Sequence, residues 1–400
     1  MDTPLKYILH EGNGVRYVML ENTVGHRWYF PWKNMRAYMS LFQPSSLKGS
    51  IVALLLPLLK YFPKLLRFVK AQRVQLQFEE QFIGTLENAL GKPEITCSVF
   101  CGSPGLHKKP TLLLLSEGKC VGYCKISDNA DIVDLFKKEE STLRYLNNKG
   151  VRHIPHIVYC APWQYDESLW LMIQTTERQR KVKVALSSDQ KVIDFVQQML
   201  QATKQKLRYE DTDYAQTLQN LERLVPLLCD KERERVVLEN INIVKEKLQT
   251  GKHDYSAFHG DLTPWNSFVV NGHLYAFDFE YFKRSYPPLA DYFHFFTQSQ
   301  IYDNYARGEQ ITANYRRIKK ERLTDVTDSD FLYRCYLLAI MEFYLNRDHG
   351  YLNERLKDIF GIWTYLLIHI KNGGVYSIGL SHKLKERLLS WMRGFHRVTL

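Results

Sequence analysis

His259-Gly260-Asp261-Leu262-Thr263-Pro264-Trp265-Asn266 is followed, after a short gap, by Asp278-Phe279-Glu280. Asp261 and Asn266 stand five residues apart, and a second aspartate, Asp278, comes next. Carboxylate and amide oxygens are the ligands that magnesium prefers, and a correctly placed aspartate can orient a hydroxyl for phosphate transfer. These two stretches therefore predict a magnesium–phosphate site.

The residues between the two stretches have the pattern of a β-hairpin. Two apolar runs flank Asn271-Gly272, which is a strong two-residue turn signal. Pairing Val270 with His273 places Asn266 next to Asp278 at the open end of the hairpin. Since cross-strand neighbours lie about 5 Å apart, both side chains can share one magnesium ion.

HGDLTPWN, FDFE and the later Asp291 resemble the aminoglycoside phosphotransferase and choline kinase superfamily of small-molecule kinases. The resemblance implies an α+β, protein-kinase-like fold with two lobes, and ATP and Mg²⁺ as cofactors. It further implies that Asp261 is the catalytic residue, which orients the acceptor hydroxyl and accepts its proton. Asn266 and Asp278 would bind the metal, and Asp291 would brace the loop around Asp261 by accepting backbone amide bonds.

Residues 1–90 lie outside this resemblance and are unusually basic. The whole chain of 400 residues has a net charge of +11, and residues 22–78 contain nine Lys or Arg but no Asp or Glu. The same stretch holds a leucine-rich run that is interrupted by Pro57 and Pro63 and is too short to span a bilayer. Contact with an anionic membrane surface and packing as a helical cap on the kinase lobe both remain open.

Residues 91–176 contain several short strand patterns and are expected to form the β-rich N-lobe. Gly102 and Gly105 lie in a turn where backbone amides can approach phosphates, although a plain hairpin turn would also explain them. Lys125 lies inside an apolar strand, where an unpaired ammonium is costly. It is either an edge-strand lysine that points to water or a lysine with a specific charged partner.

The resemblance favours the second interpretation, in which Lys125 holds the α- and β-phosphates and pairs with a helix glutamate. The segment 131–149 has apolar side chains at helical spacing, and Glu139 falls on their face. Glu140 is the competing candidate. The resemblance also implies that backbone groups near Gln174 and Thr176, at the end of an apolar strand, bind the adenine.

Residues 177–400 have mostly helical patterns and are expected to form a helical C-lobe with the catalytic loop 259–266 and the metal motif 278–280. The roles of two further residues remain open. Glu280 can bind a second metal, bind a substrate cation or be a solvated carboxylate. His259 can act as a base or pack beside the loop.

These patterns predict an ATP- and magnesium-dependent kinase that phosphorylates a hydroxyl of a small molecule or of a glycan or glycolipid precursor. A protein kinase and an inactive nucleotide-binding scaffold are the alternatives. Seven scattered cysteines fit free thiols in a reducing compartment, so we expect a cytoplasmic protein, peripheral on the inner face of the membrane if residues 22–78 bind lipid. The positive charge comes without a nucleic-acid recognition motif, so nucleic acid is not an expected partner.

Overall fold

The computed structural model describes four stretches of the chain, residues 4–42, 47–102, 109–179 and 182–370. They form two compact units. Unit 1 comprises the described parts of Met1–Ala185 and Pro264–Phe282, and unit 2 comprises those of Leu186–Thr263 and Lys283–Leu400. No helix in the described stretches is long and apolar enough to cross a membrane. Gly105 lies outside the described residues.

Unit 1 is built on one eight-stranded antiparallel sheet. Its strands are β1 (Leu9–Glu21), β2 (Arg27–Pro31), β3 (Ala71–Phe78), β4 (Thr96–Phe100), β5 (Thr111–Ser116), β6 (Lys119–Ser127), β7 (Ile157–Trp163) and β8 (Asp166–Thr175). Their order across the sheet is β3-β1-β2-β4-β5-β6-β8-β7. The helices of this unit are α1 (Met35–Tyr38), α2 (Leu47–Leu59), α3 (Pro63–Leu66), α4 (Glu80–Leu90) and α5 (Ala130–Asn148).

Both faces of this sheet are covered, because the apolar side chains of its central strands point alternately to either side. On β5, Leu112 and Leu114 join a core cluster with Phe82 of α4. Leu113 and Leu115 join a second cluster, on the other face, with residues of α1, α2 and α3. The apolar runs of the central strands thus support helices on both sides.

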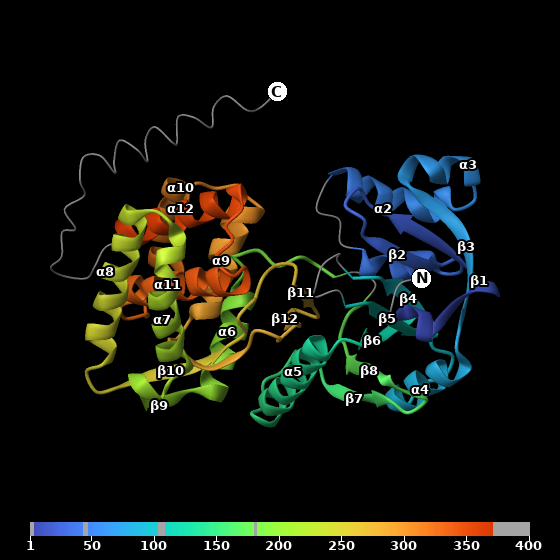
Figure 1. The fold of residues 1–400 in the computed structure, drawn as a ribbon, viewed down its shortest axis with the longest axis horizontal. Coiled ribbons are helices and arrows are strands. Elements are labelled where there is room, and N and C mark those ends of the chain that lie inside the picture. The colour runs from blue at the N-terminus through green and yellow to red at the C-terminus, as the bar shows by residue number, and fades with distance from the viewer. Residues whose placement is uncertain (1–3, 43–46, 103–108, 180–181, 371–400) are drawn as a thin grey trace. The chain divides into compact units, whose positions relative to one another are not determined.

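The sequence predicted residues 1–90 to be a segment separate from the N-lobe, but they form part of its sheet. Residues 1–90 supply β1, β2 and β3, which continue the same sheet that β4 to β8 form (Figure 1). The alternative of a helical cap holds for α2 and α3, which pack against this sheet. The strand pattern was missed because the register of β1 shifts between Glu11 and Val15, which breaks its alternation.

Unit 2 is mainly helical. Its helices are α6 (Gln190–Thr203), α7 (Asp213–Leu224), α8 (Lys231–Leu248), α9 (Ala290–Tyr302), α10 (Gly308–Arg322), α11 (Ser329–Arg347) and α12 (Glu354–His369). A small sheet with the order β13-β10-β9 contains β9 (Gln205–Arg208), β10 (Lys252–Phe258) and β13 (Lys283–Tyr286). Helix α9 is buried along almost its whole length and packs on α6 and α11 (Figure 1). The predicted α+β class, β-rich first and helical afterwards, is confirmed.

The hairpin between the two motifs belongs to unit 1 and consists of β11 (Ser267–Val270) and β12 (His273–Ala276). Val270 pairs with His273, as predicted. The pairing continues beyond the strands, where the Phe277 amide donates to the Asn266 carbonyl over 3.1 Å. Asn271 and Gly272 both have positive φ angles, as the turn signal requires.

Candidate functional site

Three charged side chains of unit 1 meet at Lys125 of β6. Its Nζ lies 2.7 Å from Glu139 Oε2 on α5 and 2.8 Å from Asp278 Oδ1, which follows β12. Lys125 and Glu139 are buried, whereas the Asp278 side chain is 27% exposed. The competing candidate, Glu140, pairs instead with Arg144 of its own helix. The structure therefore brings Lys125, Glu139 and Asp278 together.

Burial and charge act in opposite directions on this cluster. Burial disfavours the ammonium form of Lys125, but the carboxylates of Asp278 and Glu139 more than offset this effect and hold its pKa above its usual range. Burial raises the pKa of Glu139, and the Lys125 ammonium opposes that rise. Lys125 is therefore a permanent cation at neutral pH, fixed by one deeply buried and one accessible partner.

A second ion pair lies beside the first. Lys109, which precedes β5, pairs with Glu280. The Glu280 side chain is only 12% exposed, so it is not the solvated carboxylate that was one of its three interpretations. Glu280 also helps to raise the pKa of Lys125. The cluster thus contains two cations and three carboxylates. The role of Lys109 was not predicted, because it lies 171 positions from Glu280 and no local sequence pattern connects the two.

The predicted metal ligands, Asn266 and Asp278, both line the same cavity of unit 1. Asp278 has a φ of 70°, a left-handed conformation that aspartate and asparagine tolerate better than most residues. Among the described residues, no group of three or more His, Cys, Asp or Glu is arranged to hold a metal ion. Magnesium fits this donor set because it commonly takes one or two protein oxygens and completes its shell with water and phosphate.

The cavity has a volume of about 410 Å³, which is within the range of small-molecule sites. Lys109, Lys125 and Asp278 lie in its wall, and Gly102 lines it as well. Gly102 has a φ of 82°, and a Cβ there would lie 2.9 Å from the Lys109 backbone. The chain therefore approaches itself too closely at Gly102 for any larger residue.

The residues predicted to bind adenine also belong to this cavity. Gln174 and Thr176 both line it. Gln174 is buried, and its Oε1 has no hydrogen-bond partner among the described residues. The backbone of Thr175 is already used, since its amide donates to His156 O and its carbonyl accepts from Tyr275 Oη. The unpaired Gln174 amide oxygen is thus a better candidate for a bound base than the Thr175 backbone.

Part of the cavity wall comes from the N-terminal segment. His26, Trp28 and, on the element after α1, Ser40 and Leu41 line it together with Phe100 of β4. Trp28 and Phe100 stack with ring centroids 5.1 Å apart, and His26 meets both rings edge-on. These residues were missed because the resemblance began after residue 90. The aromatic residues of 22–78 therefore serve partly as a cavity wall.

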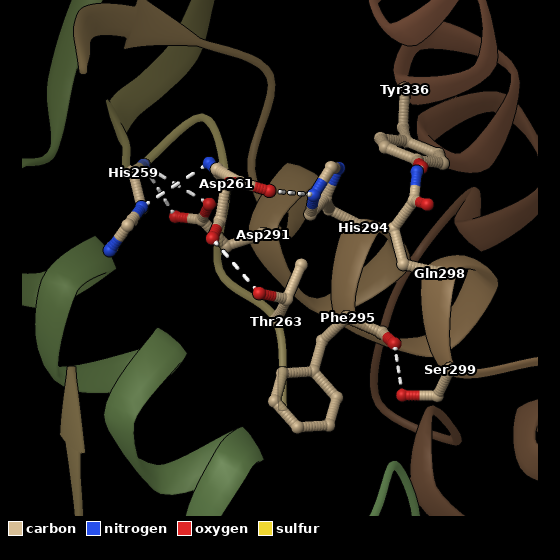
Figure 2. Close-up of polar contacts among 9 residues, drawn as sticks. All are labelled: His259, Asp261, Thr263, Asp291, His294, Phe295, Gln298, Ser299 and Tyr336. Carbon is tan, nitrogen blue, oxygen red and sulfur yellow. Dashed lines mark hydrogen bonds and ion pairs between the residues drawn. The ribbon is translucent and has the colours of Figure 1, made fainter. Parts of the chain in front are cut away.

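Unit 2 holds the catalytic candidate Asp261 in the loop after β10 (Figure 2). The Nε2–H of His294 on α9 donates to Asp261 Oδ1 over 3.2 Å, since a carboxylate can only accept. The Asp261 amide in turn donates to His259 Nδ1 over 3.2 Å. His259 is fully buried, which supports packing beside the loop and not a role as base. The contact of His294 with Asp261 was not predicted, because the two residues lie 33 positions apart and no local sequence pattern connects them.

Asp291, also on α9, accepts the His259 amide at both carboxylate oxygens, over 3.0 and 2.9 Å. Figure 2 shows this carboxylate directly below the loop that carries Asp261. Burial raises the pKa of Asp291 to about 7, and the amides of His259 and Gly260 oppose the rise. The bracing contact that the resemblance implied is thus present.

We predict that Asp291 makes stability depend on pH. Its folded pKa of about 7 lies above the ordinary value of 3.8, so between these values the folded state holds a proton that the unfolded state has released. The free energy of unfolding should therefore fall as pH rises toward 7, by up to about 1.4 kcal/mol per pH unit. Urea unfolding of the protein and of Asp291→Asn, which cannot titrate, measures the difference.

Asp194→Asn, at an exposed position on α6, is the matched control and should keep the pH dependence of the parent protein. Parallel pH profiles for the parent and Asp291→Asn would show that Asp291 is ionised in the folded state over the whole range.

Comparisons with known proteins give only structural similarity. No family model matches the chain, and no curated protein matches it. The aminoglycoside phosphotransferase APH(2")-IIa in complex with streptomycin and ATP is 14% identical over 73% of this chain and 99% of its own, with a TM-score of 0.43. A thermostable mutant of APH(4)-Ia without ligand is 12% identical over 71% and 98%, with a TM-score of 0.47.

A Haemophilus somnus 129PT protein proposed to be a fructosamine-3-kinase is 12% identical over 73% of this chain and 97% of its own, with a TM-score of 0.42. With identities this low and TM-scores below 0.5, these similarities do not support any particular reaction. The evidence for a reaction is the geometry of the side chains. The chain is similar in structure to small-molecule kinases of the aminoglycoside phosphotransferase type.

Proposed function

We propose that the protein transfers the γ-phosphate of ATP to a hydroxyl of a small molecule or of a glycan or glycolipid precursor, with magnesium. One observation carries this proposal: Lys125 is held between Glu139 and Asp278 in the wall of a cavity of about 410 Å³. Lys125 is a buried cation with one buried partner, Glu139, and one accessible partner, Asp278. Such a lysine is suited to bind phosphate oxygens if the accessible carboxylate holds a metal.

In this proposal Asp278 and Asn266 bind magnesium, which neutralises charge on the phosphates. Asp278 is the more exposed partner of Lys125, so its carboxylate would hold the metal while Glu139 keeps the lysine in place. The Lys125 ammonium would bind phosphate oxygens. Lys109 is a second cation in the same wall and can do the same.

The base of the nucleotide is assigned to the part of the cavity near Gln174 and Thr176. The buried and unpaired Oε1 of Gln174 supports this assignment, because an amino group of a base would satisfy it. Phe268 of β11 and Tyr275 of β12 also line the cavity and offer apolar surface to a planar ring.

Asp261 of unit 2 is proposed to orient the acceptor hydroxyl and accept its proton. Its side chain is 30% exposed, so a hydroxyl can reach it. His294 fixes the direction of the carboxylate through its contact with Oδ1. Asp291 fixes the loop through the His259 amide. An intact loop of this kind argues against an inactive scaffold.

A small acceptor is favoured over a protein substrate by the segment after the metal motif. Ten residues separate Glu280 from Asp291, and four of them form β13. Protein kinases use a longer segment at this place to dock a peptide, so a protein substrate has little chain to bind here.

The proposal includes a cytoplasmic location and contact with an anionic membrane through residues 22–78. All seven cysteines are free thiols, as is usual for proteins of a reducing compartment. Membrane contact would bring the enzyme to a glycolipid acceptor, or to a lipid-linked precursor of a surface polysaccharide or lipopolysaccharide.

Asp261→Asn should lower kcat, measured as ADP production, by at least about 100-fold, because a positioned general base contributes this much or more. The KM for ATP should stay nearly unchanged, since the substitution removes a role in the transition state and leaves the nucleotide cavity intact. Magnesium-dependent turnover of ATP with a panel of sugars, choline, ethanolamine and glycolipids measures both constants. Asp194→Asn is the control, and equal turnover in Asp261→Asn would end this assignment.

Lys125 and Asp278 should produce different defects in nucleotide binding. Lys125→Met combined with Glu139→Gln, which leaves no unpaired buried charge, should weaken ATP binding about tenfold or more with or without magnesium. Asp278→Asn, which keeps the left-handed backbone, should weaken binding only when magnesium is present. Calorimetric titration of ATP at saturating magnesium and with a chelator separates the two.

Lys92→Met, at an exposed position of unit 1, should bind ATP like the parent protein in both conditions. If the two defects depended on magnesium in the same way, the assignment of phosphate binding to Lys125 and of metal binding to Asp278 would be wrong.

A further inference from the structure

Helix α2 has two apolar faces, and the described residues cover only one of them. Val52, Leu56 and Leu59 point inward and pack on the core cluster that contains Phe30. Four large side chains at helical spacing face outward instead, with exposed fractions between 39% and 73%: Ile51, Leu54, Leu55 and Leu58. A helix that is apolar all round is normally buried on all sides. The outer face of α2 is therefore expected to contact another molecule or surface.

The exposed apolar surface continues past α2 through Tyr61 and Phe62 to α3 and the short helix η3 (Arg67–Val69). We name the following side chains the α2–α3 patch: Ile51, Leu54, Leu55, Leu58, Tyr61, Phe62, Leu65 and Phe68. They are eight of the eighteen large hydrophobic side chains that are exposed in the described part of the chain. Such a concentration within one short segment indicates an interaction surface and not scattered exposure.

The charge beside the patch is mainly positive. A groove of about 580 Å³ next to α3 is lined by Lys64, Arg67, Lys70 and Arg73. Its one carboxylate, Glu21, pairs with Arg27 over 2.8 Å. Since residues 22–78 contain no Asp or Glu, the groove favours an anionic ligand.

Two cations of the segment are used inside the protein and do not count toward this surface. Lys60 is buried, donates to the Trp32 carbonyl over 2.5 Å and lies 5.0 Å from the centroid of the Tyr61 ring. The Arg73 guanidinium donates to the Lys60 carbonyl and stacks on Trp32. The exposed cations that remain at the groove are Lys64, Arg67 and Lys70.

We propose that the α2–α3 patch docks on the surface of an anionic lipid bilayer. Its leucines and aromatic side chains enter the boundary between headgroups and acyl chains, and the three cations bind headgroup phosphates. A second copy of the chain is a poorer occupant. A symmetric contact would bring the same cations of both copies together without a carboxylate from this segment to balance them.

This inference deepens the membrane contact included in the proposed function, but its test uses no nucleotide. Co-sedimentation with vesicles of equimolar phosphatidylglycerol and phosphatidylcholine, and with pure phosphatidylcholine vesicles, measures the binding. The full chain should bind the anionic vesicles, and binding should fall as salt rises. Failure here leaves the phosphotransferase proposal untouched, and failure of the turnover assay leaves the docking proposal untouched.

Two sets of exposed substitutions separate the charge from the apolar contribution. Lys64→Glu with Arg67→Glu and Lys70→Glu should lower the vesicle partition coefficient by at least about 100-fold, because each cation near an anionic surface contributes about fivefold. The matched control with equal change of charge is Lys6→Glu with Lys92→Glu and Lys149→Glu, at exposed positions in unit 1 outside the patch and its groove. It should lower binding much less.

The apolar set is Leu54→Gln with Phe68→Gln, and its control is Val15→Gln with Tyr165→Gln, all at exposed side chains. The first set should lower binding about tenfold or more, and the control should not. Absence of vesicle binding by the full chain, or equal losses in a set and its control, would overturn the proposal. So would a dimer in sedimentation velocity that Leu54→Gln with Phe68→Gln converts to a monomer, because a second copy would then cover the patch.

Discussion

The Lys125 ammonium is the group on which the rest of unit 1 depends. A charge in this position is costly unless it is paired, and removing one partner of a buried pair typically costs about 3–5 kcal/mol. β6 supplies the lysine, α5 supplies Glu139, and the hairpin β11–β12 delivers Asp278. The ion pairs therefore tie a strand, a helix and a hairpin that are far apart in the sequence to one point in the cavity wall.

The two faces of the large sheet have different roles: one packs on the core cluster with α4, and the other carries the cavity. Cys124 and Ile126 of β6 point into the core cluster beneath α4, so Lys125 between them points to the opposite face. The N-terminal helices cover this opposite face next to β1–β3, while the cavity lies over β4, β5, β6 and β8. The same N-terminal segment therefore completes the core, lines the cavity with Trp28 and leaves the α2–α3 patch exposed.

How much the sequence could predict depended on whether the signal was local. The register of Val270 with His273 was predictable because the Asn271-Gly272 turn dictates it. The contact of Lys125 with Glu139 was implied by the family resemblance, and the cost of a buried charge and the helical spacing around Glu139 agreed with it. Contacts such as Lys109 with Glu280 and His294 with Asp261 span long sequence separations without a local pattern, so only the fold reveals them.

The N-terminal strands were missed for a different physical reason. The strand β1 carries the bulge after Glu11, and charged and glycine residues there hide its period of two. The basic charge of residues 22–78 suggested a surface role, although Trp28 in this stretch is buried against Phe100. Composition thus indicated the character of the segment but not its place in the sheet.

The most direct test of the central claim is calorimetric titration of the unmodified protein with ATP and with adenosine, each with and without magnesium. If Lys125 and Asp278 bind phosphate and metal, ATP should bind about tenfold or more tightly than adenosine, and magnesium should strengthen the binding of ATP only. Equal affinity for ATP and adenosine, or an ATP affinity that magnesium does not change, would contradict the claim.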